Sequence, residues 1–282
     1  MYSGYSIGAL TAALSAKWLL ADHGWRAVVW LGALPILTIP AFIILLPESV
    51  EFLVLRGKAE KAAKVAQRMG IAVPAPVVRD HAPGLGSVLR VIFSAQKALE
   101  TICFWLALFM GLLLVYGLAQ WLPQIMRKSG YDLGDSLLFL AVFSFSSAIG
   151  GIVLGSWADR FGVKKTIALS YLVGAFGIAL LALGGPLLVN YLLVANAGFG
   201  TVFASLILTG YLAQRLDPSI RSAGTGFALS FSRLGALTGP LVGGYIASIN
   251  AEPRWNFYIF AGIALIASMI TALIPKGAND RA

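Results

Sequence analysis

One arginine stands near the middle of a long apolar stretch. Arg233 lies about 11 residues into the run 222–249, which places it about 16 Å from one end of a helix at the usual rise. A cation at that depth of a membrane costs on the order of 2.5–3.5 kcal/mol to insert, so it must face the interior of a bundle or water. The guanidinium fork can bind both oxygens of a carboxylate. Arg233 is therefore a candidate partner for an anionic ligand; structural pairing with helix-end carbonyls or another helix's carboxylate is the alternative.

Polar side chains recur at helical spacing in a second apolar stretch. Tyr116 and Gln120 are one turn apart, so they lie on the same face of a helix. Such a stripe in a membrane helix lines either a cavity or a contact with a neighbouring helix. We expect Tyr116 and Gln120 to line a binding pocket for the ligand whose charge meets Arg233. Asn196, in a third stretch, is a further candidate for binding the ligand, or for hydrogen bonding to a neighbouring helix.

The residues that catalysis or metal binding needs do not come together in the sequence. The single cysteine, Cys103, lies inside an apolar run, and the two histidines, His23 and His81, lie far apart without ligand-type neighbours. There is no zinc-protease motif, no nucleophile elbow and no carboxylate pair inside an apolar run. The sequence thus predicts a protein that is not an enzyme and has no metal site and no cofactor.

Charges gather instead in a short turn between two apolar runs. The turn reads Gly-x-x-x-Asp-Arg-x-Gly-x-Lys-Lys, and its defining residues are Gly155, Asp159, Arg160, Gly162, Lys164 and Lys165. An ordinary basic turn, held on one side of a membrane by its cations, is one interpretation. The ordered pattern is more specific. It resembles the signature loop of major facilitator superfamily transporters, and the resemblance implies that charge contacts of this loop hold one gating state closed.

Membrane-spanning helices must position these residues. The chain of 282 residues is 59% hydrophobic and 12% charged, about half the charged fraction of a soluble domain. The net charge of +9 does not indicate nucleic-acid binding, because the basic residues form no patch interleaved with exposed aromatics. The predicted fold is an all-α polytopic membrane protein. A window of about 19 residues predicts eight spans, at about 2–21, 27–46, 99–122, 136–158, 166–183, 186–210, 222–249 and 257–274.

The basic residues predict the orientation of these spans. Most of the 21 Lys and Arg residues fall after the second, fourth and sixth spans and in the tail. Those connections and the C-terminus are therefore predicted to be cytoplasmic. The longest connection, 47–98, carries a predicted surface helix over 56–69, with alanines on one side and basic residues on the other.

An internal repeat orders the spans. The string Gly8-Ala-Leu-Thr of the first span resembles Gly235-Ala-Leu-Thr of the seventh, and a loop with Trp and Arg follows each span. The repeat advances by six helices, which is the architecture of major facilitator transporters. On that resemblance, 99–275 is a complete C-terminal half, 276–282 is a cytoplasmic tail, and 47–98 is the central loop. Residues 1–46 are then the last two helices of an N-terminal half whose first four helices the sequence lacks.

Three further strings resemble known families. Pro47-Glu-Ser-Val-Glu-Phe-Leu resembles a motif that closes the sixth helix in several facilitator families. The run from Gly111 to Pro123 and the string Arg221-Ser-Ala-Gly-Thr-Gly resemble helix seven and helices ten to eleven of the aromatic acid:proton symporter family.

The resemblance implies proton-coupled uptake of aromatic carboxylates, such as benzoate or hydroxybenzoates, across the bacterial inner membrane. The implied partners are the organic anion, protons, the lipid bilayer and a missing N-terminal fragment. The aspartate motif of the family's first helix has no counterpart, so transport by this chain alone is not expected. The alternatives are a facilitator for another organic anion, metabolite or sugar, and a truncated gene product without transport activity.

Overall fold

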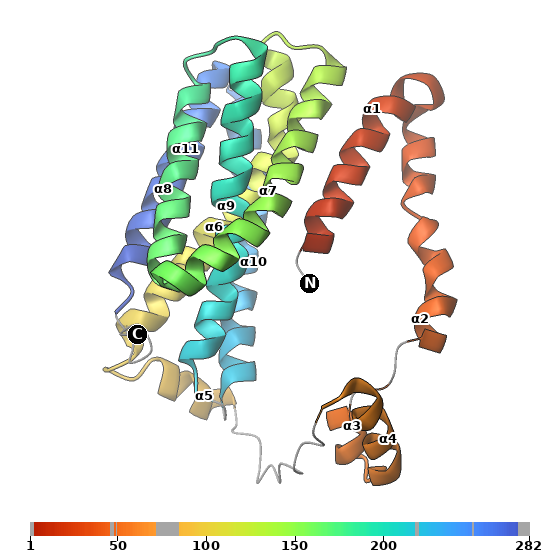
Figure 1. The fold of residues 1–282 in the computed structure, drawn as a ribbon. Coiled ribbons are helices and arrows are strands. Elements are labelled where there is room, and N and C mark those ends of the chain that lie inside the picture. Colours follow the sequence, from red (N-terminus) through yellow and green to blue (C-terminus); the bar gives the residue numbers. More distant parts are fainter. Residues whose placement is uncertain are drawn as a thin grey trace. The chain divides into compact units, whose positions relative to one another are not determined.

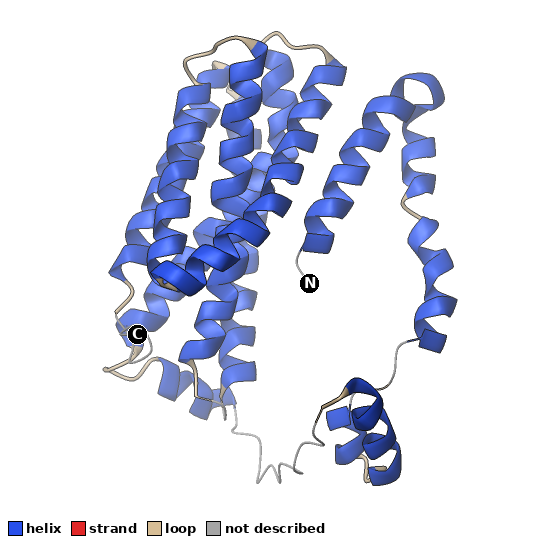
Figure 2. Ribbon diagram, in the orientation of Figure 1, coloured by secondary structure: helices blue, strands red, loops and turns tan. Residues whose placement is uncertain are grey.

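The chain folds into two compact units. The computed structural model describes residues 3–45, 48, 50–71, 85–217, 220–249 and 251–275. Regular structure within these residues is helical throughout, without a strand (Figure 2). One unit comprises residues 1–22 and 83–282, and the other comprises residues 23–82. The domain boundaries predicted after residues 46, 98 and 275 concern membrane topology and remain predictions. Pro47, Ser49 and the tail 276–282 lie outside the described residues.

Six long helices form a bundle in the larger unit (Figure 1). They are α6 (Ala98–Lys128), α7 (Leu133–Phe161), α8 (Val163–Leu181), α9 (Leu187–Arg215), α10 (Arg221–Ser248) and α11 (Pro253–Leu273). The shortest has 19 residues and the longest 31, so at the usual rise they are about 28–46 Å long and can cross the hydrocarbon core of a bilayer. The same unit contains α5 (Leu85–Ile92) and the first segment of α1 (Ser3–Leu31).

The predicted spans are found as helices. Six helical stretches are long and apolar enough to cross a membrane: Asp22–Ile43, α6, α7, α8, α9 and α11. The first predicted span is the shorter apolar helix Ile7–Leu20. The seventh is α10, which has 28 residues but is rich in glycine, serine and threonine and contains Arg233. The expectation of an all-α protein with about eight membrane helices is therefore confirmed.

The smaller unit begins within α1. Gly24 has a φ of 71°, which glycine adopts without strain, so α1 is two helices joined at a kink. Ala62 and Ala66 pack against Val50 and Leu53, which leaves the basic side chains of the same helix exposed. Four elements follow the kink: η1 (Leu34–Thr38), α2 (Ile39–Leu45), α3 (Val50–Leu55) and α4 (Ala59–Met69). The packing just described joins α3 to α4. Helix α4 covers Ala59–Met69 of the surface helix that was predicted over 56–69.

Glycines let α6 and α10 approach each other closely. A Cβ atom on Gly235 would overlap the carbonyl oxygen of Phe109 and lie 2.9 Å from its carbonyl carbon. A Cβ atom on Gly239 would overlap the carbonyl oxygen of Leu113 and lie 2.8 Å from the amide nitrogen of Gly117. These neighbours are backbone atoms and cannot turn aside. Close backbone approach at small residues is the usual way in which membrane helices associate, and α6 and α10 form the most extensive contact among the helices that the structure describes.

Basic side chains hold the end of the last helix. Lys164, at the start of α8, donates a hydrogen bond to the carbonyl oxygen of Ile274. Arg215, at the end of α9, donates to the carbonyl oxygen of Pro275 over 2.9 Å and forms an ion pair of 2.6 Å with Glu100 at the start of α6. The last carbonyls of a helix lack intrahelical partners, so these cations tie α11 to the ends of three other helices.

Candidate ligand-binding site

The packing of α6 against α10 brings two of the predicted site residues together. Nη1 of Arg233 lies 3.4 Å from the hydroxyl oxygen of Tyr116, which is a long hydrogen bond. It is the one hydrogen bond of this guanidinium to a described residue, so most of its five N–H groups can meet a ligand. Arg233 is exposed and Tyr116 is half-buried. The two side chains therefore pair an accessible cation with a phenol hydroxyl.

A hollow of about 350 Å³ opens beside Tyr116, which we call the Tyr116 pocket. Three helices and the first segment of α1 supply its wall, and all of them belong to the larger unit. The lining residues are Ala9, Ala12, Ala13, Ala16, Val115, Tyr116, Ala119, Gln120, Leu137, Leu140, Phe143, Ser144, Ser147 and Val202. Small-molecule sites of this size are mostly apolar with a few polar groups that orient the ligand, and this wall has that composition.

The predicted stripe on α6 faces this pocket. Tyr116 and Gln120 both line it, and Tyr116 also contacts Arg233 on the neighbouring helix α10. The side-chain amide of Gln120 is exposed and has no hydrogen-bond partner among the described residues. An amide in that state can accept or donate a hydrogen bond to a ligand.

Asn196 lies elsewhere. On α9 it faces α8, where a Cβ atom on Gly177 would lie 3.0 Å from the Oδ1 atom of Asn196. That Oδ1 atom is buried without a hydrogen-bond partner in the described structure. Asn196 therefore occupies a helix–helix contact, and the structure does not bring it together with Tyr116, Gln120 and Arg233.

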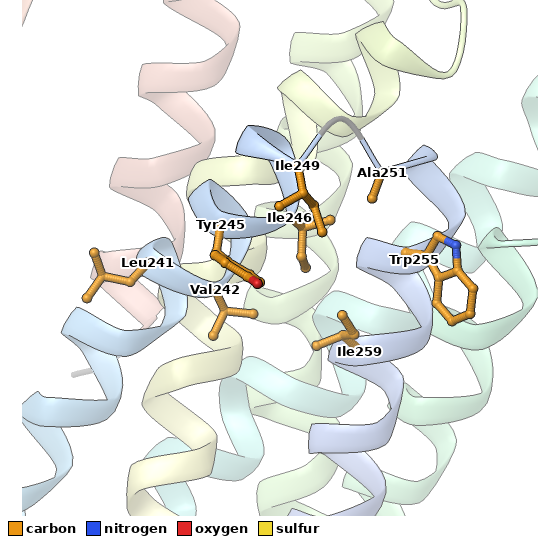
Figure 3. A pocket seen from close by; sticks show the side chains of 8 residues that line it. All are labelled: Leu241, Val242, Tyr245, Ile246, Ile249, Ala251, Trp255 and Ile259. Atoms are coloured by element: carbon orange, nitrogen blue, oxygen red, sulfur yellow. The ribbon is translucent and has the colours of Figure 1, made fainter.

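A second hollow is larger but chemically different. It measures about 500 Å³ and lies between α10 and α11, where apolar side chains and the ring of Tyr245 surround it (Figure 3). Its lining residues are Leu241, Val242, Tyr245, Ile246, Ile249, Ala251, Trp255 and Ile259. None of these carries a charge, and neither does any residue lining the Tyr116 pocket. The difference is that Tyr116 of the Tyr116 pocket contacts the guanidinium of Arg233. An anion needs a cation once it loses its hydration, so the Tyr116 pocket is the better candidate for an anionic ligand.

Comparison with protein families identifies the class of protein. A family model described as Major Facilitator Superfamily matches residues 1–209, and a second match covers residues 136–280. The chain belongs to the Major Facilitator Superfamily. The two matches overlap, as expected when one model aligns with an internally repeated chain. With its long apolar helices, this superfamily member is an integral, multi-pass membrane protein.

Several curated relatives are similar to this member of the superfamily along almost its whole length. A benzoate transport protein of Acinetobacter baylyi is 33% identical, and the match covers 100% of this chain and 61% of the relative. A gallate transporter of Pseudomonas putida is 31% identical, covering 100% and 64%. A 4-hydroxybenzoate transporter of Pseudomonas aeruginosa is 29% identical, covering 97% and 62%. The chain thus spans about three-fifths of the length of these relatives.

The loop that resembles the superfamily signature is a tight turn. Gly162 alone separates α7 from α8, and its φ of 90° favours glycine. Asp159, Arg160 and Lys165 are exposed. Asp159 makes no ion pair with a described residue, whereas Lys164 donates to Ile274 as described above. At Gly155 a Cβ atom would meet nothing within 4 Å, so packing within the described residues does not require glycine there.

Sequence reasoning missed the wall opposite Tyr116. Ala9, Ala12, Ala13 and Ala16 follow the spacing i, i+3, i+4 and i+7, which places them on one helix face. That stripe of small residues was a readable signal for a contact face. Ser144 gave no such signal, because a serine in an apolar helix usually bonds to its own backbone.

Proposed function

We propose that this chain forms part of a secondary transporter that carries aromatic carboxylates, such as benzoate or hydroxybenzoates, across the bacterial inner membrane together with protons. The observation that most directly supports this proposal is the accessible guanidinium of Arg233, which lies next to the Tyr116 hydroxyl and beside an apolar pocket. The names of the three relatives, for benzoate, gallate and 4-hydroxybenzoate, support the aromatic acid as substrate class.

The chemistry of an aromatic acid matches this arrangement. A carboxylate taken out of water needs a fixed cation, because an unpaired buried charge is prohibitively costly. Arg233 supplies that cation, and its fork suits both oxygens of the carboxylate. The ring needs apolar walls, which the alanines of α1 and the side chains of α7 supply. Tyr116 and Gln120 then orient the ring from α6.

The remaining parts of the proposal concern topology and gating. The C-terminus and the turn at Gly162 lie on the cytoplasmic side, in accordance with the distribution of basic residues. The loop residues Asp159 and Arg160 take part in closing one gating state. Since the relatives are longer, the complete transporter includes helices that this sequence does not contain, and the substrate site at the midplane is shared with them.

Ligand binding by the chain itself tests the proposal. The Tyr116 pocket and Arg233 lie within one unit, so equilibrium binding of labelled benzoate and 4-hydroxybenzoate to the purified chain in lipid nanodiscs is the direct measurement. We expect saturable binding that Arg233→Ala abolishes. Arg233→Lys should weaken it although the charge is kept, because lysine cannot hold both carboxylate oxygens.

Arg254→Lys is the matched control, because Arg254 lies at the start of α11 and is paired with Glu252. This variant should bind as the unmodified chain does. Unchanged affinity in Arg233→Ala would place the anion elsewhere and refute the site. Arg233-dependent binding of a different organic anion, without binding of aromatic acids, would favour a facilitator for another substrate.

A further inference from the structure

Ser144 differs from the other serines of its helix. Helix α7 contains Ser136, Ser144, Ser146, Ser147 and Ser156. The hydroxyls of the other four donate to a backbone carbonyl three or four residues earlier, at 2.6–3.1 Å. This is how serine hydroxyls in helices normally find a partner. The Oγ atom of Ser144 makes no hydrogen bond to any residue that the structure describes.

The unpaired hydroxyl of Ser144 lies at the candidate ligand-binding site. Ser144 is only 4% exposed and lines the Tyr116 pocket. Its Oγ atom is not among the fully buried polar atoms that lack a partner, namely Asn190 Oδ1, Asn196 Oδ1, Thr225 Oγ1 and Asn256 Oδ1. The hydroxyl therefore keeps some accessible surface, and the hollow that Ser144 lines is where a ligand can reach it.

We propose that Ser144 is a specificity-determining residue that recognises a ring hydroxyl of the aromatic acid in the Tyr116 pocket. The proposal rests on the proposed function, and it narrows the substrate class from aromatic acids to hydroxylated ones. A serine hydroxyl both donates and accepts, so it pairs with a phenol O–H in either direction. The Tyr116 hydroxyl already contacts Arg233 at the carboxylate end, whereas Ser144 is free on the α7 wall.

Burial makes this contact selective. Gln120 also lines the pocket with an unpaired polar group, but it is exposed, and water can replace a ligand there. At Ser144 little water has access, so an acid without a ring hydroxyl leaves the serine unpaired. A site built around a polar group discriminates against analogues that lack its partner. One neutral hydrogen bond corresponds to about a 2- to 12-fold difference in affinity.

The test compares affinities for benzoate and for 2-, 3- and 4-hydroxybenzoate, measured with the purified full chain in lipid nanodiscs. In Ser144→Ala we expect the hydroxybenzoate that binds best to lose about 5- to 10-fold in affinity, while benzoate changes by less than about twofold. Ser146→Ala is the matched control: its hydroxyl donates to the carbonyl of Phe143 over 2.9 Å, and it does not line the pocket. Ser146→Ala should leave the ratio of the hydroxybenzoate affinity to the benzoate affinity unchanged.

Two results overturn the proposal. One is an equal loss for benzoate and the hydroxybenzoates in Ser144→Ala, which indicates a structural role. The other is no change for any of the four acids. Failure of the proposed function looks different, since the unmodified chain then binds none of the acids or binds them independently of Arg233. Thermal unfolding of each variant, read from the dye labelling of buried Cys103, confirms that the variants are folded.

Discussion

The close approach of α6 and α10 can be tested by adding a single methyl group. In Gly235→Ala the new Cβ atom meets the carbonyl group of Phe109, including its carbon at 2.9 Å. Because the neighbour is backbone, the helices must separate. Overpacking of this kind costs about 1–3 kcal/mol, and we expect the upper end. Alanine also gains about 1 kcal/mol over glycine in helix propensity. The net loss is then about 2 kcal/mol, or about 4–8 °C in melting temperature for a chain of this size.

A matched control lies on the same helix. Gly226 of α10 has nothing within 4 Å of an added Cβ atom, so Gly226→Ala gains helix propensity without a clash and should melt at the same temperature or slightly higher. The assay is thermal unfolding of the purified chain in detergent, followed with a thiol-reactive dye. The single cysteine, Cys103, is buried and becomes reactive only on unfolding. Equal melting temperatures for Gly235→Ala and Gly226→Ala would refute the close packing.

The same substitution also bears on the ligand site. Separation of α10 from α6 moves Arg233 away from Tyr116, which it contacts at 3.4 Å. Gly235→Ala should therefore weaken binding of benzoate even at a temperature where the variant is folded, while Gly226→Ala should not. Loss of stability without loss of affinity would show that Arg233 reaches the ligand independently of this helix pair.

Three other outcomes are expected. Arg215→Gln should lower the free energy of unfolding by about 1–3 kcal/mol, because the ion pair of Arg215 with Glu100 is largely buried. Lys97→Gln breaks an exposed ion pair with Asp217 and should lower it by less than about 1 kcal/mol. Equal melting temperatures for the two variants would contradict this. Asp159→Asn should shift the accessibility of cysteines introduced on the two sides of the membrane in a protein restored to the relatives' length, and unaltered labelling rules out gating. Cells expressing only these 282 residues should take up labelled 4-hydroxybenzoate no faster than vector controls, because alternating access needs two halves around one site; saturable uptake disproves that.

The fold was largely predictable because its determinants are local. Apolar runs of the length of a bilayer specify helices wherever they occur. The predicted spans 136–158 and 166–183 left residues 159–165 as a connection, whereas α7 and α8 extend into these charged residues and only Gly162 separates the two helices. The span predicted at 222–249 is also a helix in the structure, α10, although its many small residues lower its hydropathy. Those small residues serve packing against α6, and their positions in the sequence indicate that role.

The sequence could predict which site residues lie together only where they belong to the same helix. The spacing of Tyr116 and Gln120 showed that they share a face, and the depth of Arg233 showed that it needs a polar neighbour. That Tyr116 is this neighbour depends on which turns of α6 and α10 touch, which is fixed by contacts at Gly235 and Gly239. Asn196 illustrates the limit: its type suited a ligand site, but its helix face meets α8.

The alanine wall of the Tyr116 pocket has a consequence for the entropy of binding. Ala9, Ala12, Ala13 and Ala16 present methyl groups, which have no rotamers to lose when a ligand settles against them. A side chain such as leucine or methionine in their place would be immobilised by the ligand, at a cost of about 0.5–1.5 kcal/mol each. A flat aromatic ring therefore meets a surface that is already ordered. Discrimination among ring substituents is left to the opposite walls, where side chains carry hydroxyl and amide groups.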